Sequence, residues 1–181
     1  DLVRPDTNFS IAENFLYMLN GEKPTERMSR AMDICLILHA DHGFNASTFA
    51  SLVTISTLSD MYSAVTTAIG TLKGPLHGGA NQGVMVMLQE IGNIEDAEAY
   101  VMNKLEHKER VMGFGHRVYK AYDPRATYLK TFAEAIAQDT GNLQLFNLSK
   151  EIESIMDREV GPKGVYPNVD FYSATTYYSL G

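Results

Sequence analysis

The stretch VMGFGHRVYKAYDPRA, residues 111–126, interrupts a chain that otherwise consists mostly of helix-forming patterns. Two glycines flank an aromatic residue, His116 follows at once, and the stretch closes on a DPR turn that contains Arg125. Glycine lets another molecule approach the backbone closely, and proline fixes the turn. The imidazole of His116 titrates near neutral pH, and the guanidinium of Arg125 forms paired hydrogen bonds with carboxylates. These residue types together favour a site for an anionic substrate.

Helix signals dominate the rest of the chain. Helix-starting residues precede apolar patterns at Ser10, Thr25 and Asn45, and the third pattern runs on through Val65. Further helices are expected over residues 80–91, 94–105, 125–137 and 143–160. Residues 165–171 fit a short strand or, because of Pro167, an extended connector. The sequence therefore predicts a mainly α-helical fold.

Composition excludes several classes of protein. A net charge of −7 without a basic stripe argues against nucleic-acid binding. Cys35 is the single cysteine, so an intrachain disulfide is impossible, and a reducing, cytoplasmic location is expected. The most apolar long run, residues 51–70, contains Asp60 and many hydroxyl side chains, so we expect no membrane span and no signal peptide is visible. The chain begins without methionine and stops soon after an apolar-rich run begins, which predicts a piece of a larger protein.

Candidate functional residues lie in the breaks between the expected helices. Besides residues 111–126, these breaks are HADHGFN at 39–45, KGPLHGG at 73–79 and YPNVDF at 166–171. A carboxylate such as Asp170 becomes a stronger base where water is excluded, because desolvation raises its pKa. Each candidate also has a purely structural explanation: the histidines as packed or capping residues, and Asp170 as a helix cap. The spacing of His39 and His42 also permits a metal on one helix face, but no carboxylate or thiol cluster accompanies them, so no metal site is expected.

Four segments in this order resemble the citrate synthase family, of the prokaryotic type: LHADHGFNASTF, GPLHGGANQGV, GFGHRVYKAYDPRA and PNVDFYSA. The resemblance covers essentially the whole chain. It implies the citrate synthase fold, in which a large and a small helical domain enclose the active site and two subunits form a homodimer. It further implies that residues 1–77 belong to the large domain, 78–173 to the small domain, and 174–181 to a truncated return to the large domain.

The family's roles transfer to this chain by motif. His77 would hydrogen-bond the thioester carbonyl of acetyl-CoA, Asp170 would remove a methyl proton, and His116 would protonate the ketone of oxaloacetate. His42 and Arg125 would hold oxaloacetate. The expected coenzyme A contacts are Val111, Met112, Gly113, Phe114, Gly115 and Lys120. No cofactor is implied, because the coenzyme A thioester is itself a substrate, and the reaction is an acyl transfer of the tricarboxylic acid cycle.

The resemblance leaves the exact activity open. Two further arginines that the family supplies to oxaloacetate would lie beyond Gly181, so the isolated chain is expected to be inactive. A 2-methylcitrate synthase would use propionyl-CoA with the same residues, and one methylene is worth only about 1–3 kcal/mol in a pocket. The same motifs would also fit a citrate-synthase-like module of a citrate-cleaving lyase, or a helical module without catalytic activity.

Overall fold

The chain folds into helices connected by short loops. The computed structural model describes residues 2–40, 43–75, 77–116, 119 and 121–181. In this part of the chain, nine α-helices and two 3₁₀ turns, Ile94–Asp96 and Gly161–Lys163, are present. The predicted helical class is confirmed. The helices are α1 (Ile11–Asn20), α2 (Glu26–Ala40), α3 (Ala46–Ser56), α4 (Met61–Leu72), α5 (Gly79–Ile91), α6 (Ala97–Glu106), α7 (Pro124–Thr140), α8 (Leu143–Val160) and α9 (Val169–Leu180).

The first helix shows how local sequence fixes an element. Ser10 caps α1, because its hydroxyl accepts from the Glu13 amide at 3.2 Å while the Glu13 carboxylate accepts from the Ser10 amide at 2.8 Å. Gly21 ends the helix with a φ of 78°, which glycine adopts without steric cost. The start at Ser10 agrees with the prediction.

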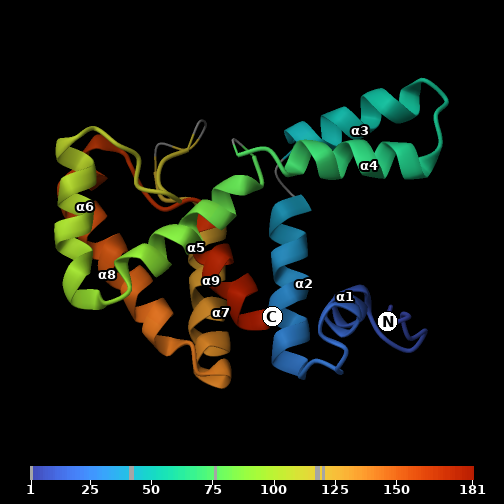
Figure 1. Ribbon diagram of the computed structural model, residues 1–181, viewed down its shortest axis with the longest axis horizontal. Coiled ribbons are helices and arrows are strands. Elements are labelled where there is room, and N and C mark those ends of the chain that lie inside the picture. The colour runs from blue at the N-terminus through green and yellow to red at the C-terminus, as the bar shows by residue number, and fades with distance from the viewer. Residues whose placement is uncertain (1, 41–42, 76, 117–118, 120) are drawn as a thin grey trace.

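The long pattern from Asn45 through Val65 is two helices, so the expectation of one continuous helix is wrong. The chain turns between α3 and α4, where Leu58 has a φ of 63° and Asp60 caps the second helix. The two helices run side by side as a hairpin that projects from the rest of the molecule (Figure 1). The apolar residues that continue across the turn hid this break in the sequence.

Helix α9 was missed by the sequence analysis, and it is the centre of the fold. It packs most extensively against α7 and then against α5 (Figure 1). Nine of its twelve residues are buried, so it has apolar contacts all round and no amphipathic stripe to reveal it. Residues 165–168 form one isolated antiparallel bridge, between Pro167 and Phe114, so of the two alternatives for residues 165–171 the extended connector is present, and α9 begins at Val169.

Two clusters of buried side chains stabilise the molecule. The larger joins Cys35 of α2 to the facing sides of α5–α9, and the smaller joins α1 and α2 to Ile136 and Leu180. The expected domain boundary at residue 77 falls at the turn before α5, whereas the one after Ser173 falls inside the unbroken helix α9. Among the described residues, no helix is long and apolar enough to cross a membrane.

Candidate active site

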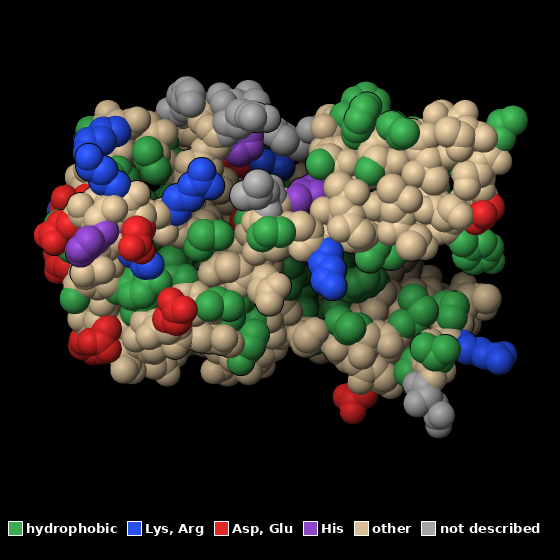
Figure 2. Space-filling model, turned by 45° about the horizontal axis from the view of Figure 1, so that its top comes forward, with side chains coloured by type: hydrophobic (Ala, Val, Ile, Leu, Met, Phe, Trp, Pro, Cys, Tyr) green, Lys and Arg blue, Asp and Glu red, His purple; other side chains and the backbone are tan. Residues whose placement is uncertain are grey.

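The candidate residues come from four elements that meet where the α3–α4 hairpin joins the body formed by α5–α9. Those that the structure describes lie in the turn before α5, in the loop between α6 and α7, in the first turn of α7, and in the first turn of α9. Histidine side chains gather with basic side chains in the furrow between the two parts (Figure 2). Segments far apart in the sequence thereby surround one hollow.

His77 links the hairpin to the body. Its Nε2 lies 3.3 Å from the backbone nitrogen of Ser47 and 3.0 Å from the Ser47 hydroxyl. Because an amide N–H can only donate, Nε2 accepts, and this tautomer carries its proton on Nδ1. Ser47 contacts Nε2 of His77, so the N–H at Nδ1 is the donor that His77 can present to a substrate.

The glycine loop carries His116. The Gly115 amide donates to the carbonyl of Tyr166 at 2.9 Å, and the amide and side chain of Asn168 donate to the carbonyls of Gly113 and Gly115, each at 2.9 Å. This pairing lays the loop against the connector into α9. The Tyr119 amide donates to His116 Nδ1 at 3.0 Å, which leaves the proton of the neutral ring on Nε2.

Gly113 is required by space as well as by conformation. Its φ is 81°, and an added Cβ would lie 2.8 Å from the Phe171 ring and 2.9 Å from the Val84 side chain. The loop therefore lies directly on α5 and α9. Phe114 packs against Phe171 with a ring separation of 4.6 Å, so the aromatic residue between the two glycines faces inward.

Asp170 lies in the first turn of α9, whose start is capped by Asn168. Burial raises the pKa of the Asp170 carboxyl, and electrostatic interactions with His39, Arg125 and His77 offset only part of that shift. A carboxylate with a raised pKa is a stronger base than one in water. The local environment therefore suits Asp170 to proton abstraction.

Arg125 is held by the residue that caps its own helix. The Asp123 carboxylate accepts hydrogen bonds from Arg125 Nε at 3.1 Å, from Nη2 at 2.8 Å and from the Arg125 backbone amide at 3.0 Å. Burial alone would raise the pKa of Asp123, but these bonds and the guanidinium charge outweigh burial and lower it. Since a guanidinium has five N–H donors, this pair leaves donors for a second carboxylate while fixing their direction.

Asn81 was missed by the sequence analysis. It lies four residues after His77, inside the GPLHGGAN motif, so the motif itself was the available signal. Its side-chain amide donates to the Ser173 hydroxyl at 2.6 Å and to the Asp170 carbonyl at 3.4 Å. Asn81 thus joins the helix that follows His77 to the helix that carries Asp170.

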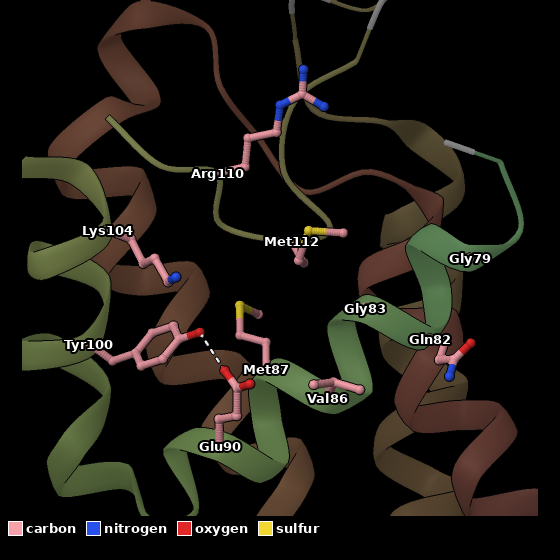
Figure 3. A pocket seen from close by; sticks show the side chains of 10 residues that line it. All are labelled: Gly79, Gln82, Gly83, Val86, Met87, Glu90, Tyr100, Lys104, Arg110 and Met112. Carbon is pink, nitrogen blue, oxygen red and sulfur yellow. Dashed lines mark hydrogen bonds between the residues drawn. The ribbon is translucent and has the colours of Figure 1, made fainter. Parts of the chain in front are cut away.

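The expected coenzyme A residues differ in their exposure. Val111 and Gly113 are buried, whereas Met112 lines a cavity of about 380 Å³ between α5, α6 and the loop (Figure 3). Arg110 and Lys104 supply positive charge around this cavity, although Lys104 also pairs with Glu109 at 2.5 Å. The sequence analysis did not single out these two basic residues.

Two predicted contacts, His42 and Lys120, lie outside the described residues. The neighbouring His39 is described: its Nδ1 donates to the Cys35 carbonyl at 2.7 Å. Among the described residues, no group of three or more His, Cys, Asp or Glu side chains is placed to hold a metal ion.

Comparison with known proteins agrees with this arrangement. The family model described as "Citrate synthase, C-terminal domain" matches residues 1–181. The chain belongs to the citrate synthase family. A citrate synthase of Deinococcus radiodurans is 55% identical over all of this chain and 48% of the relative. The chain therefore spans about half the length of the curated relatives that it matches. A 2-methylcitrate synthase of Shewanella oneidensis is less similar, at 44% identity over all of this chain and 48% of the relative.

Solved structures of the family share the fold. Citrate synthase from Pyrobaculum aerophilum superposes with a TM-score of 0.90 at 45% identity, over all of this chain and 46% of that one. Citrate synthase from Thermoplasma acidophilum, solved as a ternary complex with carboxymethyl coenzyme A and oxaloacetate, gives a TM-score of 0.86 at 42% identity, over all of this chain and 48% of that one. The predicted citrate synthase fold is thus confirmed.

Proposed function

We propose that the protein containing this chain is a citrate synthase, which condenses acetyl-CoA with oxaloacetate to give citrate and coenzyme A. The observation that carries the proposal is the desolvated carboxylate of Asp170, which lies close enough to His77 and Arg125 to interact with both electrostatically. A base, a neutral hydrogen-bond donor and a carboxylate-binding cation are the groups that this condensation requires. The citrate synthase name of the 55% identical relative supports the same conclusion.

The first step would form the enolate of the thioester. Asp170 takes a proton from the methyl group of the thioester, and the C–H electron pair becomes the new carbon–carbon double bond. The carbonyl electrons move to oxygen, where the Nδ1–H of His77 stabilises the developing negative charge. A thioester α-proton is too weakly acidic for a carboxylate alone, so the base and the donor must act together.

The second step would join the two substrates. The enolate carbon attacks the ketone carbon of oxaloacetate, the ketone oxygen takes the Nε2 proton of His116, and a proton from solvent restores the neutral imidazole. Hydrolysis of the thioester bond of citryl-CoA then releases citrate and coenzyme A. Arg125, oriented by Asp123, would bind a carboxylate of oxaloacetate together with His42.

Coenzyme A would lie along the loop of residues 111–115 and extend toward the cavity in Figure 3. The backbone of Gly113 and Gly115, the side chain of Met112, and Lys120 would contact it, and Arg110 would attract its phosphates. No further cofactor enters this mechanism, because the thioester supplies the activated carbon. We assign the protein to the cytoplasmic tricarboxylic acid cycle on the basis of its family.

A spectrophotometric assay of thiol release tests the proposal. We expect turnover from acetyl-CoA plus oxaloacetate in the natural polypeptide that contains this chain, and none when either substrate is omitted. Competition between acetyl-CoA and propionyl-CoA measures the acyl preference, and a higher kcat/KM for propionyl-CoA would favour 2-methylcitrate synthase. Cleavage of citryl-CoA without condensation would favour a lyase, and no turnover of any of these substrates would favour the non-catalytic module.

We also propose a homodimer that pairs through the α3–α4 hairpin. Large apolar side chains gather on the hairpin (Figure 2), including Phe49, Tyr62 and Val65, which are 63%, 86% and 51% exposed. Exposed apolar patches of this kind mark interaction surfaces, and the family is known for pairing through large-domain helices. Val65→Asp in the natural polypeptide should shift its sedimentation from dimer to monomer. Tyr128→Asp, on an apolar residue of α7 that is 63% exposed, should not.

A further inference from the structure

Glu153 of α8 is a mostly buried carboxylate outside the substrate-binding residues. Its side chain is 12% exposed. Oε1 accepts from the Tyr122 hydroxyl at 2.5 Å, and Oε2 accepts from Lys130 Nζ at 2.5 Å and from the Tyr172 hydroxyl. A single side chain therefore joins α8, α7, the turn before α7, and α9.

Two of these partners adjoin the candidate site. Tyr122 directly precedes Asp123, which orients Arg125, and Tyr172 follows Asp170 by two residues in α9. The Tyr122 ring also lies 6.3 Å from the ring of Tyr166, whose carbonyl accepts from the glycine loop. Glu153 thus connects the segment that would bind oxaloacetate to the segment that would remove the proton.

The charges favour one fixed arrangement of the cluster formed by Glu153, Tyr122, Lys130 and Tyr172. Burial alone would raise the pKa of Glu153, but hydrogen bonds from Lys130, Tyr122 and Tyr172 outweigh burial and lower it. Burial, together with the hydrogen bond to Glu153, raises the pKa of each tyrosine, so both hydroxyls remain donors. An ionised buried carboxylate keeps all its donors, because losing one leaves charge uncompensated.

We propose that Glu153 is a positioning residue, which holds the Asp123–Arg125 turn and the first turn of α9 at the spacing that the condensation needs. The inference rests on the proposed function and deepens it. Precise spacing matters because a shift of about 1 Å in a reacting group costs roughly 100-fold in rate. The cluster lies behind the residues that would touch substrate, so Glu153 would act through Tyr122 and Tyr172.

Glu153→Gln in the natural polypeptide tests this role. Glutamine has one acceptor oxygen and an amide that cannot accept, so at least one of the three donors loses its partner. The variant should still fold, because Glu153 lines a hollow of about 380 Å³ beside Lys150 and Asp157 instead of filling the core. We expect kcat/KM to fall about 10-fold to 100-fold. Glu151→Gln, exposed on the same helix, is the matched control and should leave kcat/KM unchanged.

Two conservative variants separate positioning from general structural support. Tyr122→Phe should mainly raise KM for oxaloacetate, because it releases the turn that orients Arg125. Tyr172→Phe should mainly lower kcat, because it releases the helix that carries Asp170. If both variants lower kcat in proportion to a loss of Tm, with unchanged KM values, the network is only structural and the proposal is wrong.

Amide hydrogen exchange gives a readout that does not depend on activity. Glu153→Gln should speed exchange in residues 121–125 and 169–173, whereas Glu151→Gln should not. Unchanged exchange in both segments would refute the positioning role even if the proposed function is correct. Absence of turnover in the unsubstituted protein would instead refute the proposed function, and the exchange result would still decide whether Glu153 holds these two segments.

Discussion

The α3–α4 hairpin and the α5–α9 body use similar apolar side chains in opposite ways. Within residues 46–56 and 61–72, Ala64 is the single buried residue, whereas α9 alone buries nine of its twelve. The body places most of its apolar surface in its own core, while the hairpin leaves its surface open to a partner. Both regions are helical, so secondary structure does not distinguish them.

The difference in burial has a consequence for chemistry. Asp170, Arg125 and His116 are carried by segments that pack on one another in the body, and the described contact of His77 with the hairpin runs through Ser47. Groups that move protons must keep fixed distances, and a packed core fixes them better than an open hairpin does. The body should therefore determine the rate, and the hairpin should determine assembly.

The largest expected effect is on catalysis by the body. Asp170→Asn keeps the shape of the side chain but removes the proposed base, so kcat for citrate formation should fall about 10²-fold to 10⁴-fold. Asp96→Asn is the control: Asp96 is an exposed carboxylate far from Asp170 in the sequence, and the variant should keep full activity. Steady-state thiol release measures both. Comparable kcat values for Asp170→Asn and the unsubstituted protein would show that the reaction does not use this base.

The free energy of unfolding should respond differently to substitutions in the α5–α9 body and in the α3–α4 hairpin. Met87 is 3% exposed in α5 and Met61 is 74% exposed in α4, which makes a matched pair of substitutions. Met87→Ala leaves a cavity and should lower the free energy of unfolding by about 2–5 kcal/mol. Met61→Ala should change it by less than about 0.5 kcal/mol when measured below the concentration at which chains associate.

Urea denaturation followed by circular dichroism measures both methionine variants. A large loss for Met61→Ala under these conditions would mean that the hairpin also packs within its own chain. The comparison between a self-packed body and an open hairpin would then fail. A loss that appears only at high protein concentration would instead support pairing of the hairpin with a second copy.

Sequence reasoning worked where local rules decide the structure. The ends of α1 follow from Ser10 and Gly21, and the bounds of α8 agree with the expected range 143–160. It failed where tertiary packing decides. Helix α9 buries nine of its twelve residues and is rich in Thr, Ser and Tyr, so neither an apolar stripe nor propensity marks it. The turn at Leu58 was likewise hidden among apolar residues.

The candidate site shows the same division. The motifs identified His77, His116, Arg125 and Asp170 as residue types suited to the chemistry, while their mutual positions required the fold. The supporting residues could not be predicted from types alone. Ser47 lies 30 residues from His77 in the sequence, and Tyr122 lies 31 residues from Glu153, so only tertiary structure brings each pair together.

A smaller effect is expected from Asn81, which tests the junction inside the body. Asn81→Ala removes the bond of 2.6 Å to Ser173 and the weaker one to the Asp170 carbonyl, so α5 and α9 lose a direct polar link near the base. Because one such bond contributes about 0.5–1.5 kcal/mol, kcat should fall about 3-fold to 10-fold. Gln89→Ala, on an exposed residue of α5 outside the lining of the cavity in Figure 3, controls for helix effects. Equal kcat values for both variants would show that Asn81 does not support the base.

The smallest expected effect is on thermal stability, because burying the Asp170 carboxylate destabilises the folded protein. The folded-state pKa of Asp170 is raised, chiefly by burial, so the native state binds a proton more tightly than the unfolded chain does. Its contribution to stability is therefore fully present below the unfolded pKa and is lost as pH rises through the folded pKa. Asp170→Asn removes this titration. The variant should gain Tm relative to the unsubstituted protein across that window, keep the gain at higher pH, and show none from this source at low pH. Thermal unfolding in steps of pH measures the difference, with Asp96→Asn as control. A gain that grew as pH fell would reverse the sign and show that Asp170 is stabilised, not destabilised, as a carboxylate.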